Sequence, residues 1–94
     1  MSKWSILQGE ERQCYFCLSP YVEYHHIYFG TKHRKISDKH HFTVWLCHLH
    51  HTGSSCSAHR SRSMDLILKQ ECQKKYEESH SRDDFIKLIG RSYL

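Results

Sequence analysis

Residues 23–51 read EYHHIYFGTKHRKISDKHHFTVWLCHLHH, and this stretch decides the fold together with the pair Cys14-x-x-Cys17 just upstream. The pair Cys47-x-x-His50 near its end repeats the spacing of the upstream pair. Two side chains separated by two residues in a tight turn can converge on one tetrahedral ion. The repeated spacing therefore predicts a zinc site with Cys14, Cys17, Cys47 and His50 as its ligands.

A zinc ion held by both pairs would close a long loop and order a chain that has little core of its own. Buried thiols or a disulfide are the alternatives, but the repeated spacing and the histidine in the fourth place favour the metal. Redox use of Cys14 and Cys17 is disfavoured, because the sequence lacks the strand–helix–strand pattern of thioredoxin-like proteins. Of the five cysteines, Cys56 and Cys72 are left as free thiols.

The composition limits the possible classes of protein. A chain of 94 residues, 38% of them hydrophobic, forms one small domain with a modest core, for which a metal staple is expected. No apolar run approaches the length needed to cross a bilayer, and residues 1–4 do not begin a signal peptide. We therefore expect a cytoplasmic protein with no membrane partner.

Basic residues cluster in the middle of the chain. The formal net charge is +4 with histidines neutral, and between residues 25 and 62 only Asp38 opposes the lysines and arginines. The tail from residue 63 onward balances its acids and bases. An uneven basic middle indicates a polyanion as partner, whereas a solvated basic loop is the alternative. The candidate phosphate-binding residues are Lys32, Arg34, Lys35, Arg60 and Arg62.

Hydrophobic periodicity predicts two strands around the basic segment. Residues 21–28 alternate and are rich in aromatic and β-branched side chains, and residues 42–46 have the composition of a second, antiparallel strand that leads into Cys47. Residues 29–41 between them lack a sustained apolar period and are predicted to form a loop. A short helix should begin over residues 48–52, and a short strand or an arm is expected over residues 3–8.

Two helices are predicted after the candidate metal ligands. An apolar stripe indicates an amphipathic helix over about residues 63–78. The stripe consists of Met64, Ile67, Leu68, Cys72 and Tyr76. A capping box at Ser81-x-x-Asp84, with Gly90 at the C-terminal end, predicts a short final helix. The expected fold class is α+β, a single domain of residues 1–94 with a zinc-stapled core over about residues 12–60 and a helical part over about residues 63–90.

Among the histidines that are not zinc ligands, three lie between or directly beside the two ligand pairs in a distinctive pattern, namely His25, His26 and His51. The order Cys-x-x-Cys, His-His-Ile and Leu-Cys-x-x-His-His closely resembles the HNH endonucleases of the His-Me finger (ββα-metal) superfamily. The resemblance is strongest to the short zinc-stapled members carried by bacteriophages and prophages, and it covers residues 14–59. It implies a treble-clef-like ββα-metal finger, here with additional C-terminal helices.

In that family the second residue of an Asp-His or His-His pair is the general base, so the resemblance implies this role for His26. It likewise implies that His25 and His51 hold one divalent catalytic ion, with His59 as the candidate third ligand. The implied reaction is hydrolysis of DNA phosphodiester bonds, which needs a nucleophilic water, a base and positive charge at the phosphate. An imidazole suits the base role because it is largely neutral near pH 7. The ion would be Mg²⁺, Mn²⁺, Ni²⁺ or Zn²⁺, and histidine ligands favour the later transition metals.

The chain departs from the family pattern at one position. It contains no Asn, although the family carries one shortly before the position of Cys47 to fix the loop that bears the base. His41 or Thr43 are candidates to replace it. A catalytically inactive zinc-binding module for nucleic acid or protein is therefore the alternative function. The missing Asn favours the module, and the complete histidine set favours the nuclease.

The resemblance also bears on partners and location. It implies DNA as the partner and the bacterial host cytoplasm as the location if the protein is encoded by a phage. Nucleases of this size often cut both strands as dimers, so a homodimer is a further candidate partner. Its candidate contact residues are the aromatic side chains of Trp4, Tyr15 and Tyr93.

Overall fold

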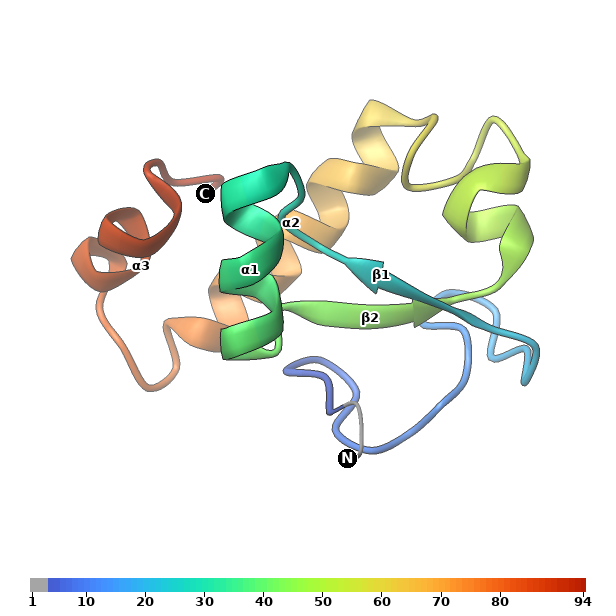
Figure 1. Cartoon of the computed structure of the whole chain (residues 1–94), viewed down its shortest axis with the longest axis horizontal. Coiled ribbons are helices and arrows are strands. Elements are labelled where there is room, and N and C mark those ends of the chain that lie inside the picture. Colours follow the sequence, from blue (N-terminus) through green and yellow to red (C-terminus); the bar gives the residue numbers. More distant parts are fainter. Residues whose placement is uncertain (1–3) are drawn as a thin grey trace.

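The centre of the structure is a two-stranded antiparallel sheet (Figure 1). Strand β1 (Glu23–His26) pairs with strand β2 (Thr43–Leu46), with Glu23 opposite Leu46 and His26 opposite Thr43. The predicted antiparallel pair is confirmed, and both strands are shorter than the segments from which they were inferred. The rings of Tyr24 and Trp45, which face each other across the sheet, lie 4.9 Å apart and provide a cross-strand aromatic contact.

The computed structural model describes residues 4–94. Residues 1–3, where the sequence indicates no signal peptide, lie outside this part of the chain. The predicted strand or arm over residues 3–8 begins at Lys3, which is likewise not described. The rest of that segment forms a tight turn, closed by a β-bridge between Ser5 and Gly9.

The prediction of a loop between the two strands is wrong, because helix α1 (Thr31–His40) occupies most of it. The helix is polar and is held by tertiary contacts rather than by an apolar stripe. Its buried Ser37 donates a hydrogen bond to the backbone oxygen of Tyr28 over 2.7 Å and accepts one from the backbone nitrogen of Tyr28 over 3.3 Å. The helix ends where His41 adopts a left-handed conformation with φ 61°.

A short π-helical turn, η1 (Leu49–Gly53), follows Cys47 and confirms the helix that was expected to begin there. Backbone nitrogen atoms of His50 and His51 both donate to the backbone oxygen of Cys47, over 3.1 Å and 2.9 Å. A Cβ atom at Gly53 would lie 2.6 Å from the ring of the exposed His48 and 3.0 Å from its backbone oxygen, so a larger residue there would displace the His48 ring. The turn thereby places two consecutive histidines immediately beyond the sheet.

The two C-terminal helices are α2 (Arg62–Tyr76) and α3 (Arg82–Ile89), as predicted. The hydroxyl oxygen of Ser81 accepts from the backbone nitrogen of Asp84 over 3.0 Å, and Gly90 ends α3 in a left-handed conformation with φ 99°. The apolar face of α2 is narrower than the predicted stripe, because Ile67 is 42% exposed. Burial raises the pKa of Cys72, which lies on this face, to about 12.

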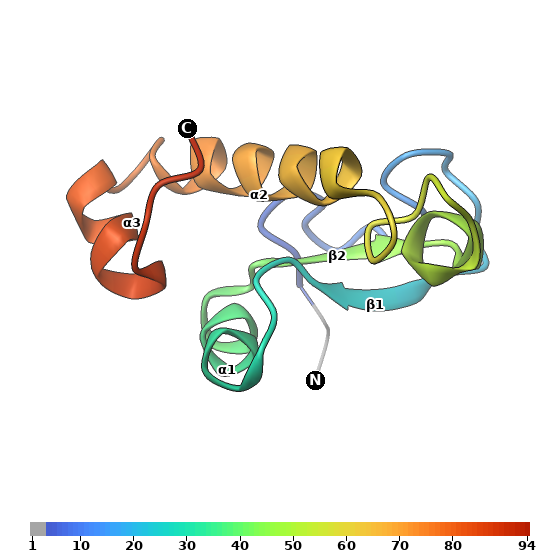
Figure 2. The same ribbon diagram turned by 90° about the horizontal axis from the view of Figure 1, so that it is seen from above.

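Helices α1 and α2 lie on opposite sides of the sheet (Figure 2). Between the sheet and the helices lies a core of buried aromatic rings, in which Tyr28 contacts Phe42 and Phe85 with centroid distances of 5.5 Å and 5.6 Å. The molecule is thus a small α+β domain. None of the helices between residues 4 and 94 has the length and apolar character that crossing a bilayer would require.

Candidate metal centres

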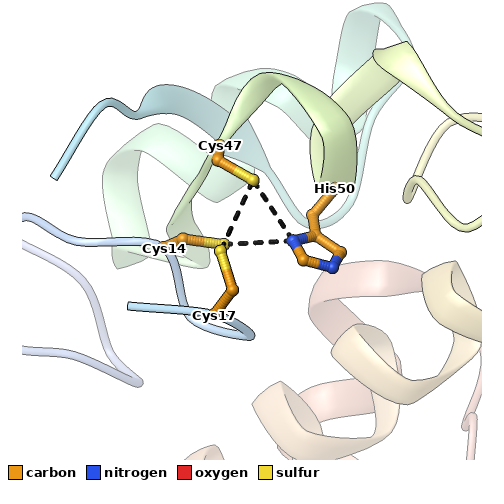
Figure 3. A group of neighbouring side chains, drawn as sticks. All are labelled: Cys14, Cys17, Cys47 and His50. Atoms are coloured by element: carbon orange, nitrogen blue, oxygen red, sulfur yellow. Dashed lines mark hydrogen bonds between the residues drawn. The ribbon is translucent and has the colours of Figure 1, made fainter. Parts of the chain in front are cut away.

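The four predicted zinc ligands come together at one end of the sheet (Figure 3). Cys14 and Cys17 lie in a tight turn that is fastened to strand β2 by a 2.9 Å hydrogen bond from the backbone nitrogen of Tyr15 to the backbone oxygen of Trp45. Cys47 directly follows β2, and His50 lies in η1. The turn and the end of the strand therefore present their side chains to the same point.

The distances within this group fit a tetrahedral ion. The sulfur atoms of Cys17 and Cys47 are 3.6 Å apart, and Nδ1 of His50 lies 3.5 Å from the sulfur of Cys14 and 3.2 Å from that of Cys47. Two sulfur ligands at about 2.3 Å from a tetrahedral zinc are about 3.8 Å apart. All five cysteines lie within the described residues, and all are free thiols. The group can hold a metal ion such as zinc.

Cys14 is prepared for metal binding by its backbone surroundings. Burial acts to raise its pKa, but hydrogen bonds from the backbone of Cys47, Cys17 and Phe16 outweigh burial and lower the pKa to about 6. The thiolate is the form of cysteine that binds metal. The thiolate of Cys14 is therefore favoured at neutral pH.

A second group of possible ligands comprises His25 of β1, His51 of η1 and His59 in the segment before α2. Nε2 of His51 lies 3.2 Å from Nε2 of His59, and the ring of His25 lies 4.9 Å from that of His59 and 5.2 Å from that of His51. One nitrogen from each ring lies within 4.8 Å of the others, so the group can hold a metal ion. The structure thus brings together the three histidines for which the sequence implied a second ion.

His25 is the most unusual side chain of this group. It is 1% exposed, yet neither of its ring nitrogens has a hydrogen-bond partner among the described residues. Buried polar atoms without partners are rare in proteins and require an explanation. Burial, followed by the positive charges of His59 and His51, lowers the pKa of His25 to about 3. The ring is therefore neutral at physiological pH, which is the state in which histidine binds metals.

Glu23 holds His51 in a defined orientation. Its Oε1 accepts a hydrogen bond from Nδ1 of His51 over 2.8 Å, and its Oε2 lies 3.4 Å from Nδ1 of the exposed His48. The hydrogen bond from His51 lowers the pKa of Glu23 below its ordinary value. With the proton on Nδ1, the lone pair of Nε2 points toward His59, which is the arrangement found for metal-binding histidines paired with a carboxylate. The sequence analysis did not identify Glu23.

His26 lies on the opposite face of β1 from His25 and makes a different contact. Its Nε2 lies 2.7 Å from Oδ1 of Asp38 on α1. Neither candidate for the missing Asn makes a side-chain hydrogen bond to His26 among residues 4–94, although Thr43 pairs with His26 across the sheet, so this expectation stays a prediction. His41 packs its ring against Trp4, and the hydroxyl of Thr43 contacts Tyr24 and the backbone of Trp4. Asp38 is the side chain that His26 contacts, and it was missed because α1 was predicted to be a loop.

One cavity of about 230 Å³ is bordered by His25, His26, His51 and His59. We call it the histidine cavity. Strand β1 ends at His26, which allows neighbouring residues from opposite faces of the strand to reach the same space. The side chains at its rim include Phe29 and Arg34. A larger cavity of about 670 Å³ lies between the N-terminal turn and the end of α2 and contains none of these histidines. The smaller cavity is the one bordered by the second group of possible metal ligands.

The five predicted phosphate-binding residues are all exposed, on α1 and at the beginning of α2. Arg34 borders the histidine cavity, and Arg62 borders a separate cavity on α2. The other three, Lys32, Lys35 and Arg60, border neither. Of the candidate dimer contacts, Trp4 is 41% exposed, whereas Tyr15 and Tyr93 are half-buried.

The structure therefore contains two separate groups of metal-ligand side chains, one of cysteines with a histidine and one of histidines alone. They are joined through η1, which carries His50 of the first group and His51 of the second. Comparisons of the chain with protein-family models, with curated proteins and with solved structures found no match.

Proposed function

We propose that this protein is a metal-dependent endonuclease of the HNH type that hydrolyses DNA phosphodiester bonds. The observation that supports the proposal best is the environment of His25, a buried and neutral imidazole whose two nitrogens lack partners and which faces two further histidines. A buried histidine of this kind is costly unless a ligand satisfies it. A divalent ion bound to His25, His51 and His59 removes that cost at one of the two nitrogens.

The two groups of ligands take different parts in the proposal. Cys14, Cys17, Cys47 and His50 hold a structural zinc. These four protein ligands complete the tetrahedral coordination of the ion. The histidine group supplies three ligands to the catalytic ion and leaves other positions open for water and phosphate oxygens. Strands β1 and β2 and the turn η1 correspond to the ββα-metal finger, with α1 inserted between the strands.

When bound, the ion would act as a Lewis acid and neutralise charge on the scissile phosphate. His26 acts as the general base and takes the proton of the attacking water. Its Nε2–H donates to the carboxylate of Asp38, so that Nδ1 keeps its lone pair for the proton. Asp38 is a positioning residue in place of the Asn that the chain lacks. Arg34, at the rim of the same cavity, supplies positive charge to the DNA backbone.

A zinc-binding interaction module without catalysis is the second candidate. The contact between His26 and Asp38 favours it, because an ordinary surface ion pair has the same geometry and would leave the imidazole without a catalytic role. The two candidates agree on the zinc. They differ in whether DNA is cut, and the partner of the module is nucleic acid or protein.

Incubation of the zinc-loaded protein with supercoiled plasmid tests the proposal. We expect conversion to nicked and linear DNA with Mn²⁺, Mg²⁺ or Ni²⁺, and none with a chelator that removes the added ion and leaves the structural zinc in place. The half-buried His33 of α1 lies outside both ligand groups, so His33→Ala serves as a histidine control that retains activity. Binding of DNA without cutting under every ion would favour the interaction module.

A further inference from the structure

The cavity on α2 that Arg62 borders lies beside the histidine cavity, on the exposed side of the helix. It has a volume of about 220 Å³, and its rim is formed by two turns of α2 and by the chain that follows α3. Its lining includes Arg62, Asp65 and Lys69 of α2 and Arg91 and Tyr93 of the C-terminal tail. We call this region the arginine cavity. Its function is not assigned by the site described above.

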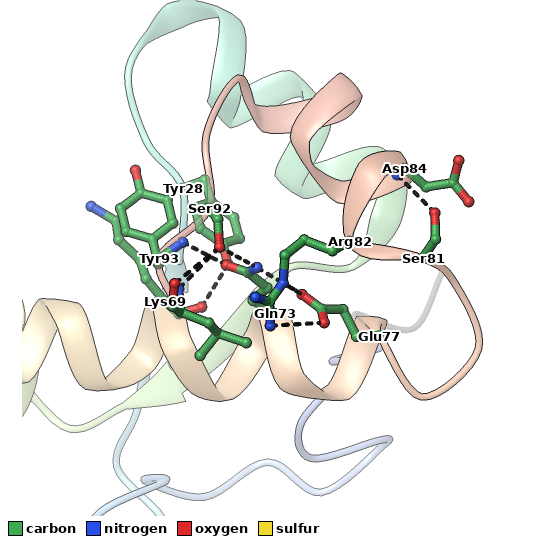
Figure 4. Close-up of polar contacts among 10 residues, drawn as sticks. Tyr28, Lys69, Gln73, Glu77, Ser81, Arg82, Asp84, Ser92 and Tyr93 are labelled. Atoms are coloured by element: carbon green, nitrogen blue, oxygen red, sulfur yellow. Dashed lines mark hydrogen bonds and ion pairs between the residues drawn. The ribbon is translucent and has the colours of Figure 1, made fainter.

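The tail that carries Arg91 is held in place by a buried glutamine of α2 (Figure 4). Gln73 is fully buried, its Oε1 accepts from the backbone nitrogen of Tyr93 over 2.7 Å, and its Nε2 donates to the hydroxyl of Ser92 over 2.9 Å. Gln70 adds a 3.0 Å hydrogen bond to the backbone oxygen of Tyr93. These contacts determine where Arg91 lies relative to α2.

The charges of the cavity leave two arginines without an acidic partner. Lys69 and Asp65 form a 2.7 Å ion pair, which is neutral as a unit. No carboxylate of residues 4–94 lies within ion-pair distance of Arg62 or Arg91. The guanidinium carbon of Arg91 lies 4.6 Å from the ring centroid of Tyr93, a stacking contact that orders the side chain. A guanidinium presents donors that match two oxygens of a phosphate.

The arginine cavity is linked to the histidine cavity by a contact between residues that line them. The ammonium group of Lys69 lies 4.4 Å from the ring centroid of Phe29, and the Phe29 ring lies 5.4 Å from that of His59. Phe29 and His59 both border the histidine cavity. A polyanionic strand that enters the histidine cavity can therefore continue across Phe29 toward the two arginines.

We infer that the arginine cavity binds a backbone phosphate of duplex DNA next to the segment held at the histidine cavity, with Arg62 and Arg91 as its donors. This inference rests on the proposed function, since it takes the histidine cavity as the point where the DNA is engaged. It adds the C-terminal tail to the interface and assigns Gln73 as the residue that positions Arg91. The interaction is with phosphate and reads no base sequence.

Binding of a fluorescent DNA duplex, followed by anisotropy with the zinc-loaded protein and no other divalent ion, tests the inference. Arg62→Ala and Arg91→Ala each remove one phosphate contact, so each should lower affinity roughly eightfold near 100 mM salt. Each should also reduce the slope of log affinity against log salt by about 0.9 between about 50 and 200 mM salt. Lys87→Ala on α3 removes the same charge from an exposed position outside the cavity and should change neither quantity.

A further variant separates the effect of the guanidinium donors of Arg91 from the effect of its charge. Arg91→Lys keeps the charge but loses the planar guanidinium, so it should retain the salt slope and recover only part of the affinity. Arginine variants that match Lys87→Ala in affinity and slope would overturn the inference, even if the protein cuts DNA. A wild-type protein that shows the arginine dependence but never cuts would instead refute the nuclease and leave the phosphate site standing.

Discussion

The two ligand groups differ in what surrounds them, and in the proposed function that difference separates a structural centre from a catalytic one. In the first group the ligands come from two segments far apart in the chain, and backbone hydrogen bonds favour the thiolate of Cys14. In the second group the ligands are three imidazoles at the edge of a cavity that also contains His26 and Arg34. A closed set of four protein ligands stabilises a fold, whereas three ligands beside an open space leave room for substrate.

The largest expected effect comes from removing a ligand of the cysteine group. Cys47→Ser should abolish folding, because structural zinc typically contributes about 10–16 kcal/mol while a small domain has only about 5–15 kcal/mol of stability. Circular dichroism and zinc analysis of the purified variant measure this. Cys56→Ser is the matched control, since Cys56 is exposed and outside the group. A folded, zinc-free Cys47→Ser protein would remove the structural centre from this account.

Loss of a ligand from the histidine group should leave the fold intact. His25→Phe replaces a buried ring by an apolar ring, so we expect retained zinc and a retained circular dichroism spectrum. Affinity for the second ion should fall by about 100-fold or more, since an ion loses one of only three protein ligands. Titration with Ni²⁺ followed by calorimetry measures this, with His80→Ala as the histidine control. Equal Ni²⁺ affinity in wild type and His25→Phe would place the second ion elsewhere.

Glu23 should act on the second ion through His51. Glu23→Ala removes the acceptor that fixes the His51 tautomer, and affinity for the second ion should fall by about 10- to 100-fold. Glu23→Gln keeps a hydrogen-bond acceptor, so its affinity for the second ion should lie between those of wild type and Glu23→Ala. His48→Ala removes the other imidazole near the same carboxylate and should leave the affinity unchanged. If His48→Ala and Glu23→Ala weaken the ion equally, the carboxylate does not act through His51.

The neutral state of His25 should appear in the pH dependence of stability. Below about pH 6.5 the unfolded chain protonates this imidazole, whereas the folded protein, with a pKa of about 3, does not. The unfolded state then binds more protons, so the free energy of unfolding falls as the pH falls, by about 1.4 kcal/mol per pH unit. Urea unfolding of wild type and His25→Phe without a second ion should show this difference in slope. Identical slopes would mean that His25 is not buried and neutral.

The sequence predicts well which possible metal ligands lie together, and poorly the residues that support them, for a physical reason. Ligand pairs such as Cys14 and Cys17 are local in the chain, so their spacing is visible without a structure. The contact of Glu23 with His51 depends on where β1 lies relative to η1, which no local pattern contains.

The same reason explains the missed helix. Helix α1 is held by the polar contacts of Ser37 and not by an apolar stripe, so its sequence shows no apolar period. Because the helix was not predicted, the contact of Asp38 with His26 was not predicted either. Arg91 was overlooked because its position depends on the buried Gln73, which is distant in sequence. Strand alternation and the capping box at Ser81 are local features, and the elements that they predicted are present.

The most direct test of the account compares His26→Ala with His51→Ala in the nicking of supercoiled plasmid over a range of Mn²⁺ concentrations. Both variants should keep the fold and the structural zinc. His26→Ala should cut about 100-fold more slowly or worse at every concentration, because no ion replaces a general base. His51→Ala should recover activity in part as Mn²⁺ rises, because it lacks a ligand of that ion. Wild-type cutting by His26→Ala, or a wild-type protein that binds DNA and cuts under no ion, would contradict the central claim.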